Sequence, residues 1–232
     1  MKQTHLRILT MEPLIRCLLL LAVLTLPAGV HAADSIGAVK AVVVYAYGSP
    51  PGASRKPIYL NDDVYAQEVV ETIRQGALHL LFRDDTDLRL GSATTITLDK
   101  FVYNPETNAG ELVASMSRGV FRFISGKIQK QGVSLRTPTS HIGIRGTDFT
   151  VAVAEDGATQ VAVSEGSVVV TPINGGAAAA VTAGQGATVG AAGNSVEVSQ
   201  ATAAASDPGL ADPDVNTSVD DAGGGGGGGG GH

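Results

Sequence analysis

The chain has 232 residues, a formal net charge of −6 and a single cysteine. The acidic balance argues against nucleic acid or an acidic membrane surface as a partner, and one cysteine excludes a disulfide framework. Aromatic residues make up only 4% of the sequence and tryptophan is absent, which favours narrow β layers over a deep ligand cavity.

The first 32 residues have the parts of a secretory signal peptide. Basic residues precede an apolar run from Cys17 to Leu26, Pro27 and Gly29 interrupt it, and small residues lead to Ala32. The run is shorter than the roughly 20 residues that a membrane span needs. We therefore predict cleavage after Ala32 and a periplasmic or secreted protein; an uncleaved membrane anchor is the alternative.

Short strands and turns are predicted from residue 33 to 199. Segment 67–75 could be a short helix, but its β-branched residues favour a strand. Turn signals recur about every ten residues, as in sandwiches, barrels and β-solenoids, and no strict repeat indicates a long regular solenoid. We therefore predict an all-β domain, either solenoid-like (β-helix) or sandwich-like. The predicted strands cover 37–47, 76–82, 88–90, 94–98, 111–116, 119–124, 133–135, 149–153, 161–163, 168–170 and 180–182.

Residues 200–232 differ in composition from the rest. Alanines and aspartates come first, and an unbroken glycine run covers 223–231. Such a segment cannot bury much apolar surface, so we predict a disordered tail. It could serve as a linker or spacer, or have no role.

The histidines and hydroxyl residues do not form a catalytic pattern. After the predicted cleavage the histidines are His79, His141 and His232. Ser140 and His141 are neighbours in sequence, which does not place a hydroxyl against an imidazole. The sequence has no nucleophile elbow, phosphate loop or metal-spaced histidine pair. We therefore expect no enzymatic activity and no cofactor, and we expect His79 to face outward or lie at the edge of the core.

An acidic turn at 83–87 joins two predicted strands. Asp84, Asp85 and Asp87 are weak candidates for ligands of a hard cation such as calcium. The turn lacks the glycine and distant glutamate of a helix–loop–helix calcium site. An ordinary solvated hairpin turn is the preferred interpretation, and the same holds for residues 61–63.

The stretch from Ile142 to Thr147 contains two glycines and an arginine between apolar residues. Gly143 and Gly146 could provide positive φ or a close approach of strands. Arg145 could bridge carbonyls or a carboxylate where the chain turns. A buried structural arch is the preferred interpretation over a ligand-binding arginine.

Several motifs in order resemble the FecR domain family over roughly residues 37–189. They are Asp84-Asp85-Thr86-Asp87-Leu88-Arg89-Leu90-Gly91, Gly119-Val120-Phe121-Arg122-Phe123, Thr137-Pro138, Ile144-Arg145-Gly146-Thr147-Asp148-Phe149, Val163-Ser164-Glu165-Gly166-Ser167-Val168 and Ala183-Gly184-Gln185. The motif residues that we expect to be structural are Thr137, Pro138, Arg145, Gly146, Thr147, Glu165, Gly166 and Gly184.

The resemblance implies an exported, solenoid-like domain that receives signals by protein contact in the periplasm of a Gram-negative bacterium. Asn61 and Asp85 stand where the family usually has glycine. Family members that regulate iron-uptake genes carry a cytoplasmic sigma-factor-binding region before a membrane helix. At most sixteen residues precede the apolar run here, so we do not expect sigma-factor regulation.

Three functions remain open. The first is a binding or signalling module that contacts another envelope protein, with the membrane contacted only transiently through the signal peptide. The second is a structural or surface-associated protein with the tail as a tether. The third is a carbohydrate- or cell-wall-binding module that uses exposed Tyr45, Tyr47, Tyr59 and Tyr65.

Overall fold

The chain folds into strands alone over the part that the structure describes. The computed structural model describes residues 34–129 and 132–201, so the predicted signal peptide and nearly all of the predicted tail lie outside these residues. No helix in the described ranges is long and apolar enough to cross a membrane. The strands are β1 (Ser35–Val43), β2 (Ala46–Ser49), β3 (Lys56–Pro57), β4 (Asp63–Tyr65), β5 (Val69–Thr72), β6 (Ala77–Phe82), β7 (Asp87–Leu90), β8 (Thr95–Asn104), β9 (Ala109–Ile124), β10 (Val133–Arg136), β11 (Ser140–Val153), β12 (Thr159–Pro172), β13 (Ala179–Thr182), β14 (Gln185–Val189) and β15 (Glu197–Gln200).

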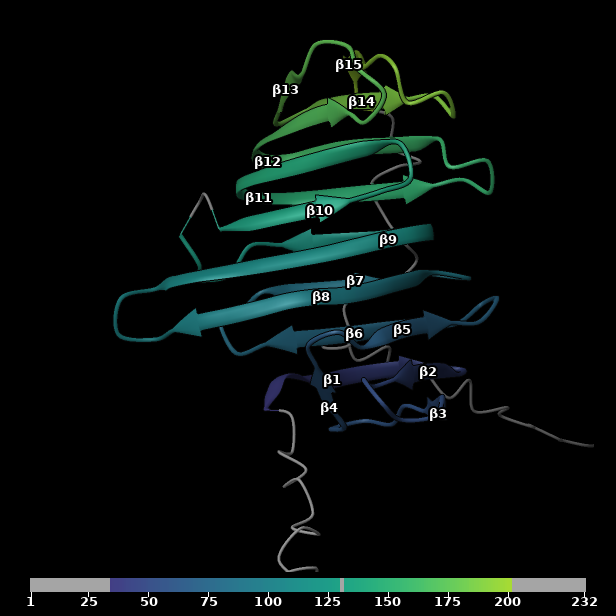
Figure 1. Ribbon diagram of the computed structural model, residues 1–232, viewed down its shortest axis with the longest axis vertical. Coiled ribbons are helices and arrows are strands. Elements are labelled where there is room, and N and C mark those ends of the chain that lie inside the picture. Colours follow the sequence, from purple (N-terminus) through teal and green to yellow (C-terminus); the bar gives the residue numbers. More distant parts are fainter. Residues whose placement is uncertain (1–33, 130–131, 202–232) are drawn as a thin grey trace, which may run out of the picture. The chain divides into compact units, whose positions relative to one another are not determined.

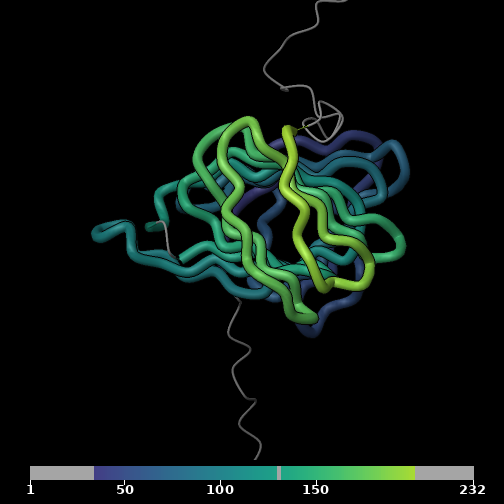
Figure 2. The backbone as a smooth tube through the Cα atoms, turned by 90° about the horizontal axis from the view of Figure 1, so that it is seen from above, coloured from purple at the N-terminus to yellow at the C-terminus, as the bar shows by residue number. Residues whose placement is uncertain are grey.

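The strands form two layers that face each other. Within each layer, the strands follow one another from the β1–β4 end of the molecule to the β15 end (Figure 1). Layer A contains β4, β1, β6, β7, β14 and β15, and layer B contains β3, β2, β5, β8, β10 and β13. Three long strands, β9, β11 and β12, take part in both layers. Seen along the stack, successive turns of the backbone lie over one another around a common axis (Figure 2).

Each long strand passes between the layers at a glycine with positive φ. Gly119, Gly146 and Gly166 have φ values of 100°, 63° and 74°. In β9 the residues before Gly119 pair with β8, and those from Gly119 onward pair with β11. Glycine tolerates this backbone conformation without the steric cost of a Cβ atom, so these positions determine where the strands bend.

The core lies between the layers, and alternate residues of each strand point into it. Phe121 and Phe123 of β9 meet Phe149 of β11, with ring centroids 6.3 and 5.5 Å apart. All three rings are at most 4% exposed. Alternation along β9 therefore places Phe121 and Phe123 in the core.

The predicted all-β class is confirmed, and the strand pairing supports the sandwich-like alternative. Neighbouring strands run antiparallel except β9 and β10, whereas a β-helix stacks parallel strands. Segment 67–75 forms β5 and no helix. Three boundaries were predicted wrongly: 37–47 breaks at Val44, 111–116 and 119–124 belong to one strand, β9, and 161–163 and 168–170 belong to one strand, β12. A bend at one residue leaves the alternation of side chains almost intact, so the pattern alone does not locate it.

Candidate functional site

The motif glycines form one corner of the sandwich. A Cβ atom on Gly166 would lie 2.1 Å from the carbonyl oxygen of Gly146 and 2.9 Å from Cγ2 of Thr147. Both glycines have positive φ, as expected for Gly146. The backbone N–H of Thr147 donates to Oγ of Ser125 at 2.9 Å, which attaches the corner to the segment after β9. The Arg-Gly-Thr and Glu-Gly motifs therefore meet as one backbone crossing.

Other parts of the predicted arch differ from expectation. Arg145 is exposed. No hydrogen bond or ion pair between its side chain and another described residue supports a bridging role. Gly143 has ordinary φ, and a Cβ there would meet nothing closer than 4.0 Å. Glu165 and Gly184 are exposed, and Gly184 has a φ of 80°.

A cluster of buried hydroxyl groups lies where β11 and β12 begin. Oγ1 of Thr159 lies 2.8 Å from Oγ1 of Thr137 and 2.9 Å from Oγ1 of Thr139. Thr137 also lies 2.8 Å from Oγ of Ser140. All four side chains are at most 8% exposed, whereas Pro138 between them is exposed. The Thr-Pro motif is therefore part of a hydrogen-bonded structural network.

Asp84 is buried, so the interpretation of residues 83–87 as a solvated turn is wrong for this residue. It is 0% exposed, and its carboxylate accepts hydrogen bonds from Oγ1 of Thr86 at 2.7 Å and from the backbone N–H of Ile128 at 3.4 Å. The backbone N–H of Lys127 donates to its carbonyl oxygen at 2.7 Å. Segment 125–128 covers the hairpin tip, and a prediction from local sequence had no sign of this distant segment.

The two other aspartates of the turn contact different partners. Asp85 has a φ of 65° and an ion pair with Lys127 at 2.5 Å. Asp87 contacts Nε2 of His79 at 2.8 Å and Nε of Arg89 at 3.0 Å. Burial alone would raise the pKa of Asp87, but the hydrogen bonds with His79 and Arg89 outweigh it and lower the pKa. Among the residues described, no group of three or more His, Cys, Asp or Glu side chains could hold a metal ion.

The histidines occupy different environments. His79 lies on the outer face of β6 and is 9% exposed, and its Nδ1 atom is buried without a hydrogen-bond partner. This is a core-edge position, as expected. His141 is exposed, whereas the neighbouring Ser140 is buried and bonded to Thr137. The two side chains therefore have separate surroundings.

The most exposed apolar surface lies at the β1–β4 end of the stack. We call it the end patch and define it by Val43, Val44, Tyr45, Tyr59 and Leu60, which are 48–63% exposed. A shallow hollow runs through it, with Lys40, Ala41, Val42 and Ile58 as its other walls. Exposed large apolar residues that cluster in this way are typical of interaction sites.

Two turns build the end patch. The first is the bend between β1 and β2, where the chain leaves layer A for layer B at Val44. The second is a turn in which the backbone N–H of Asp62 donates to the carbonyl oxygen of Tyr59 at 3.1 Å. Its αL residue is Asn61, with a φ of 66°. The backbone N–H of Ile58 donates to the carbonyl oxygen of Ala46 at 3.0 Å, which holds the two turns together.

The backbone of Val44 is strained. Its φ is 62°, in the left-handed region that β-branched residues avoid. Such a conformation costs about 1–3 kcal/mol and is characteristic of functional sites. Val44 is nevertheless 54% exposed, so burial of its side chain does not account for the strain.

The predicted tyrosines divide into two pairs. Tyr45 and Tyr59 belong to the end patch and are 59% and 63% exposed. Tyr47 and Tyr65 are half-buried, and the guanidinium of Arg55 lies 3.5 Å from the centre of the Tyr47 ring. The apolar members Val43, Val44 and Leu60 were not predicted. In a continuous strand, alternation would place apolar residues such as these in the core. The local sequence contains no signal that the chain bends at Val44 and exposes them.

The fold, a sandwich of mostly antiparallel strands over the described residues, places this domain in the all-β class. Residues 68–169 match the model of a family described as FecR protein. Residues 68–169 therefore match a FecR domain, as the motifs predict, and the matched range is narrower than the expected range of 37–189. A FecR domain suggests a signalling or regulatory module and fits a protein without catalytic activity.

Two crystal structures of a proposed anti-sigma factor from Parabacteroides distasonis ATCC 8503 are similar to this chain. Their sequence identities are 18% and 16%, and the TM-score is 0.45 for both. The alignments cover 57% of this chain and 59% of the other chain, so the match spans less than two thirds of those proteins. Similarity at this level says nothing about what the chain binds. A search of curated proteins found no match.

Proposed function

We propose that this chain is an exported FecR-domain protein that acts without catalysis, by binding another protein of the cell envelope in a signalling system. The end patch is the contact surface. The observation that carries the proposal is five large apolar side chains, 48–63% exposed, at one end of the stack.

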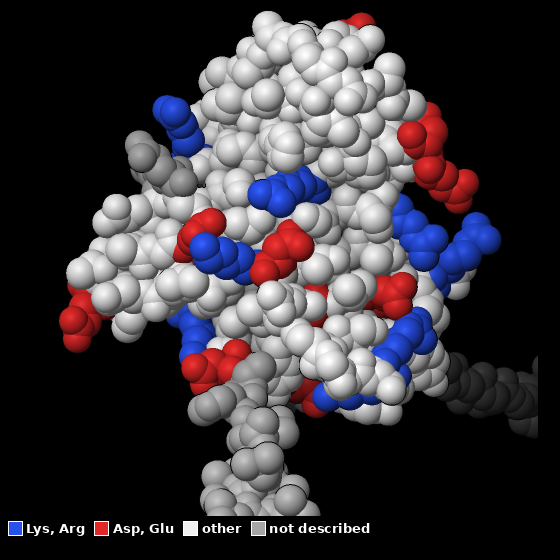
Figure 3. Space-filling view, viewed as in Figure 1, with Lys and Arg blue, Asp and Glu red and all other residues white. Residues whose placement is uncertain are grey.

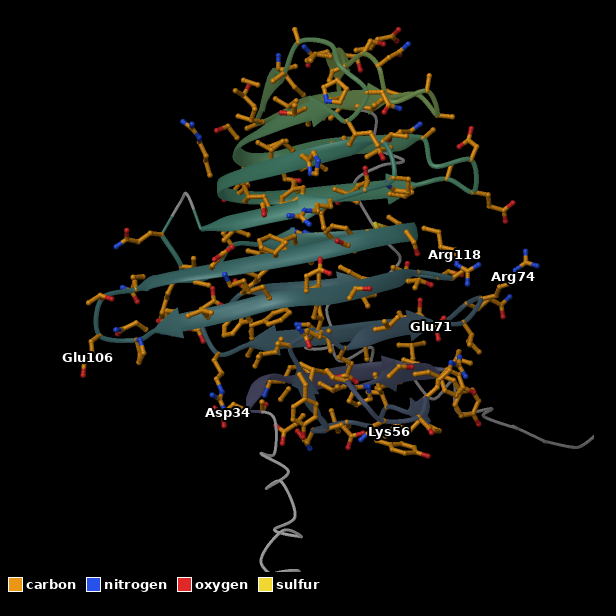
Figure 4. The ribbon with its side chains drawn as sticks, viewed as in Figure 1. Asp34, Lys56, Glu71, Arg74, Glu106 and Arg118 are labelled. Atoms are coloured by element: carbon orange, nitrogen blue, oxygen red, sulfur yellow. The ribbon has the colours of Figure 1, made fainter. Side chains whose placement is uncertain are left out.

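The composition of this end fits a protein partner. Interfaces between proteins combine an apolar, aromatic centre with a polar rim. Here the exposed residues Lys40 and Lys56 and the half-buried Asp62 lie beside the apolar members. Figure 4 shows Lys56 at this end of the molecule, below Glu71 and Arg74. The partner surface that fits has apolar side chains at its centre and charged side chains around them.

The strain at Val44 supports the same surface. A strained, exposed β-branched residue weakens the free domain, and a bound partner that buries the side chain would offset that cost. Burial of a valine side chain contributes about 1.5–3 kcal/mol, which is comparable to the strain.

Site-specific photo-crosslinking tests this proposal. A benzophenone amino acid replaces Tyr59 in the full chain, expressed in its own cells, and the matched control carries it at Glu106 on the exposed tip of the β8–β9 hairpin. We expect one envelope protein to be captured at position 59 and not at position 106. Identical capture at both positions, no capture, or only a covalent dimer of the chain would contradict the proposal.

Binding of a cell-wall carbohydrate is a second candidate, favoured by the exposure of Tyr45 and Tyr59. Aromatic rings offer an apolar face together with a hydroxyl group that can form hydrogen bonds. In this case the purified protein would sediment with cell-wall material, and Tyr45→Ala with Tyr59→Ala would abolish sedimentation. The half-buried Tyr47 provides the control, since Tyr47→Ala should leave it unchanged.

Export is tested separately. The signal-peptide pattern supports a mature protein that begins at Ala33. N-terminal sequencing of protein from the periplasmic fraction should give Ala-Asp-Ser-Ile. A protein that retains Met1 in the cytoplasm would contradict export.

A further inference from the structure

Strand β1 is paired along most of one edge and only along part of the other. β6 pairs with β1 as far as Val43, whereas β4 pairs with the opposite edge only as far as Ala38. Among the described residues, no strand pairs with residues 40–43 on that side. We call this side of residues 40–43 the open edge; Figure 1 shows β1 at the lower end of the stack. An unpaired sheet edge is a template for a strand of another chain.

The hydrogen-bonding pattern shows where the backbone of the open edge points. In an antiparallel pair, consecutive residues direct their N–H and C=O groups alternately to one neighbouring strand and to the other. The N–H of Phe82 on β6 donates at 2.9 Å to the carbonyl oxygen of Thr86, next to β7, so Leu78 also faces β7. Val42 is the partner of Leu78 on β1. The N–H and C=O groups of Val42 therefore point away from β6, to the open edge.

Val39 shows how a partner satisfies this edge. It has the same orientation as Val42, since its partner on β6 is Leu80. Its N–H donates to the carbonyl oxygen of Asp62 at 2.9 Å, and its carbonyl oxygen accepts a hydrogen bond from the N–H of Asn61 at 3.0 Å. On this side Val42 has no such hydrogen bond to a described residue. It therefore offers a donor and an acceptor to a further strand.

The open edge borders the hollow of the end patch. Ala41 and Val42 of β1 line this hollow, together with residues 58–60 of the turn after β3. Val42 is half-buried and packs against the core, whereas Val43 is 48% exposed. Side chains of an added strand alternate between the two faces of the sheet. A segment with alternating apolar residues therefore fits this place.

Lys40 determines the charge that such a segment needs. It is exposed at the start of the open edge, and no hydrogen bond or ion pair joins its side chain to another residue in the described part of the chain. Opposite charges on neighbouring strands stabilise a sheet. A second copy would bring Lys-Ala-Val-Val to this edge, and that sequence has no carboxylate. A different protein with an acidic residue in an extended, apolar segment is the better match.

We propose that the partner of the end patch binds by strand addition. An extended segment of the partner, with alternating apolar residues and an Asp or Glu near Lys40, pairs with β1 at the open edge and extends layer A. Backbone hydrogen bonds provide affinity in this mode of binding, and the alternate side chains provide specificity. The inference rests on the proposed function and specifies the chemistry of the partner.

Proline at position 42 tests the backbone contact in the photo-crosslinking assay. Val42→Pro removes the N–H that faces the open edge, and proline is tolerated where the N–H of an edge strand faces solvent. With benzophenone at position 59, we expect capture of the partner to fall several-fold, while thermal melting followed by circular dichroism verifies the fold. Unchanged capture would overturn strand addition and leave the proposed function intact. Absence of capture in the parent protein with valine at position 42 would overturn the proposed function itself.

Val198→Pro is the matched control on the other edge strand, β15. The N–H of Ala201 donates to the carbonyl oxygen of Gly184 at 2.9 Å, so alternation directs the N–H of Val198 away from β14. Val198 is 43% exposed, similar to Val43. This variant should keep the full level of capture at position 59. An equal loss of capture in both proline variants would show that the effect is not specific to the open edge and would refute the proposal.

Hydrogen exchange gives a readout without any substitution at position 42. The full chain with benzophenone at position 59 is purified with its captured partner, and its backbone N–H exchange is compared with that of the free chain. We expect the N–H of Val42 to exchange several-fold more slowly in the complex, because it gains a hydrogen bond. The N–H of Val39 is already bonded and should keep its rate. An unchanged rate at Val42 would refute strand addition.

Charge reversal tests the acidic residue of the partner. Lys40→Glu should reduce capture at position 59 several-fold. Arg136→Glu is the control, since Arg136 on β10 in layer B is likewise exposed, and it should leave capture unchanged. Full capture by the Lys40→Glu protein would overturn the acidic character of the added segment.

Discussion

Single residues of this domain have unusual backbone or electrostatic states that can be measured. Asn61 and Asp85, which stand where FecR domains usually have glycine, have φ values of 66° and 65°. Asn and Asp tolerate the left-handed region better than other residues with a side chain, so both substitutions retain the turn. Val44 has a similar φ without that tolerance, and Glu68 is a carboxylic acid that is only 1% exposed.

Val44→Gly should stabilise the free domain. Relief of backbone strain of about 1–3 kcal/mol exceeds the conformational-entropy cost of glycine, about 0.5–1 kcal/mol. We expect a net gain of about 1 kcal/mol in the free energy of unfolding, measured in urea. Val43→Gly is the matched control, since Val43 is similarly exposed and is not among the residues with positive φ; it should lose stability. A loss of stability in both variants would show that Val44 is not strained.

Glu68 should make stability depend on pH. Burial raises its pKa, and this outweighs the hydrogen bond from the backbone N–H of Tyr65. A carboxyl whose pKa is higher in the folded state than in the unfolded state stabilises the fold in acid, and this contribution disappears as the pH rises through the folded-state pKa. Relative to Glu68→Gln, the wild type should therefore lose stability as the pH rises from about 4. Parallel stability–pH curves for the two proteins would contradict this.

At the scale of the elements, the corner at Gly146 and Gly166 connects the two layers. β11 and β12 are paired on both sides of the crossing at Gly146 and Gly166, and the register shifts only between Arg145 and Phe149. The corner lets one strand contribute side chains to both layers of the core. The order of motifs in the sequence thus reflects corners and turns that meet in space.

Gly166→Ala should destabilise the domain by about 2–4 kcal/mol. The added Cβ would lie 2.1 Å from the carbonyl oxygen of Gly146, at a φ of 74°, and both the clash and the backbone conformation are unfavourable. Gly143→Ala is the matched control in the neighbouring motif, with no atom closer than 4.0 Å, and it should change stability by less than about 0.5 kcal/mol. Chemical denaturation measures both, and equal effects would contradict the role of the corner.

At the scale of the whole molecule, the two ends of the stack differ in surface chemistry. The β1–β4 end carries the apolar end patch. The other end, formed by residues 157–200, has only two charged side chains, Glu165 and Glu197. Figure 3 shows this upper part almost free of blue and red. A continuous core and three strands shared by both layers nevertheless couple the ends.

The domain should therefore unfold in one cooperative step. All five tyrosines lie between positions 45 and 103, so tyrosine fluorescence reports on the N-terminal half only. Far-ultraviolet circular dichroism reports on the strands of both halves. We expect the two thermal transitions to coincide, as two-state behaviour requires; an earlier fluorescence transition would mean that the N-terminal end unfolds separately.

The sequence by itself determined the all-β class, most of the turns and the resemblance to the FecR domain. These depend on local alternation, on glycine and on ordered motifs. Only the tertiary structure decided that Asp84 is buried under segment 125–128, that Arg145 is exposed, and that Val43, Val44 and Leu60 form a surface with Tyr45 and Tyr59. Burial depends on which distant segment covers a residue, and the bend at Val44 exposes side chains that a continuous strand would place alternately in the core.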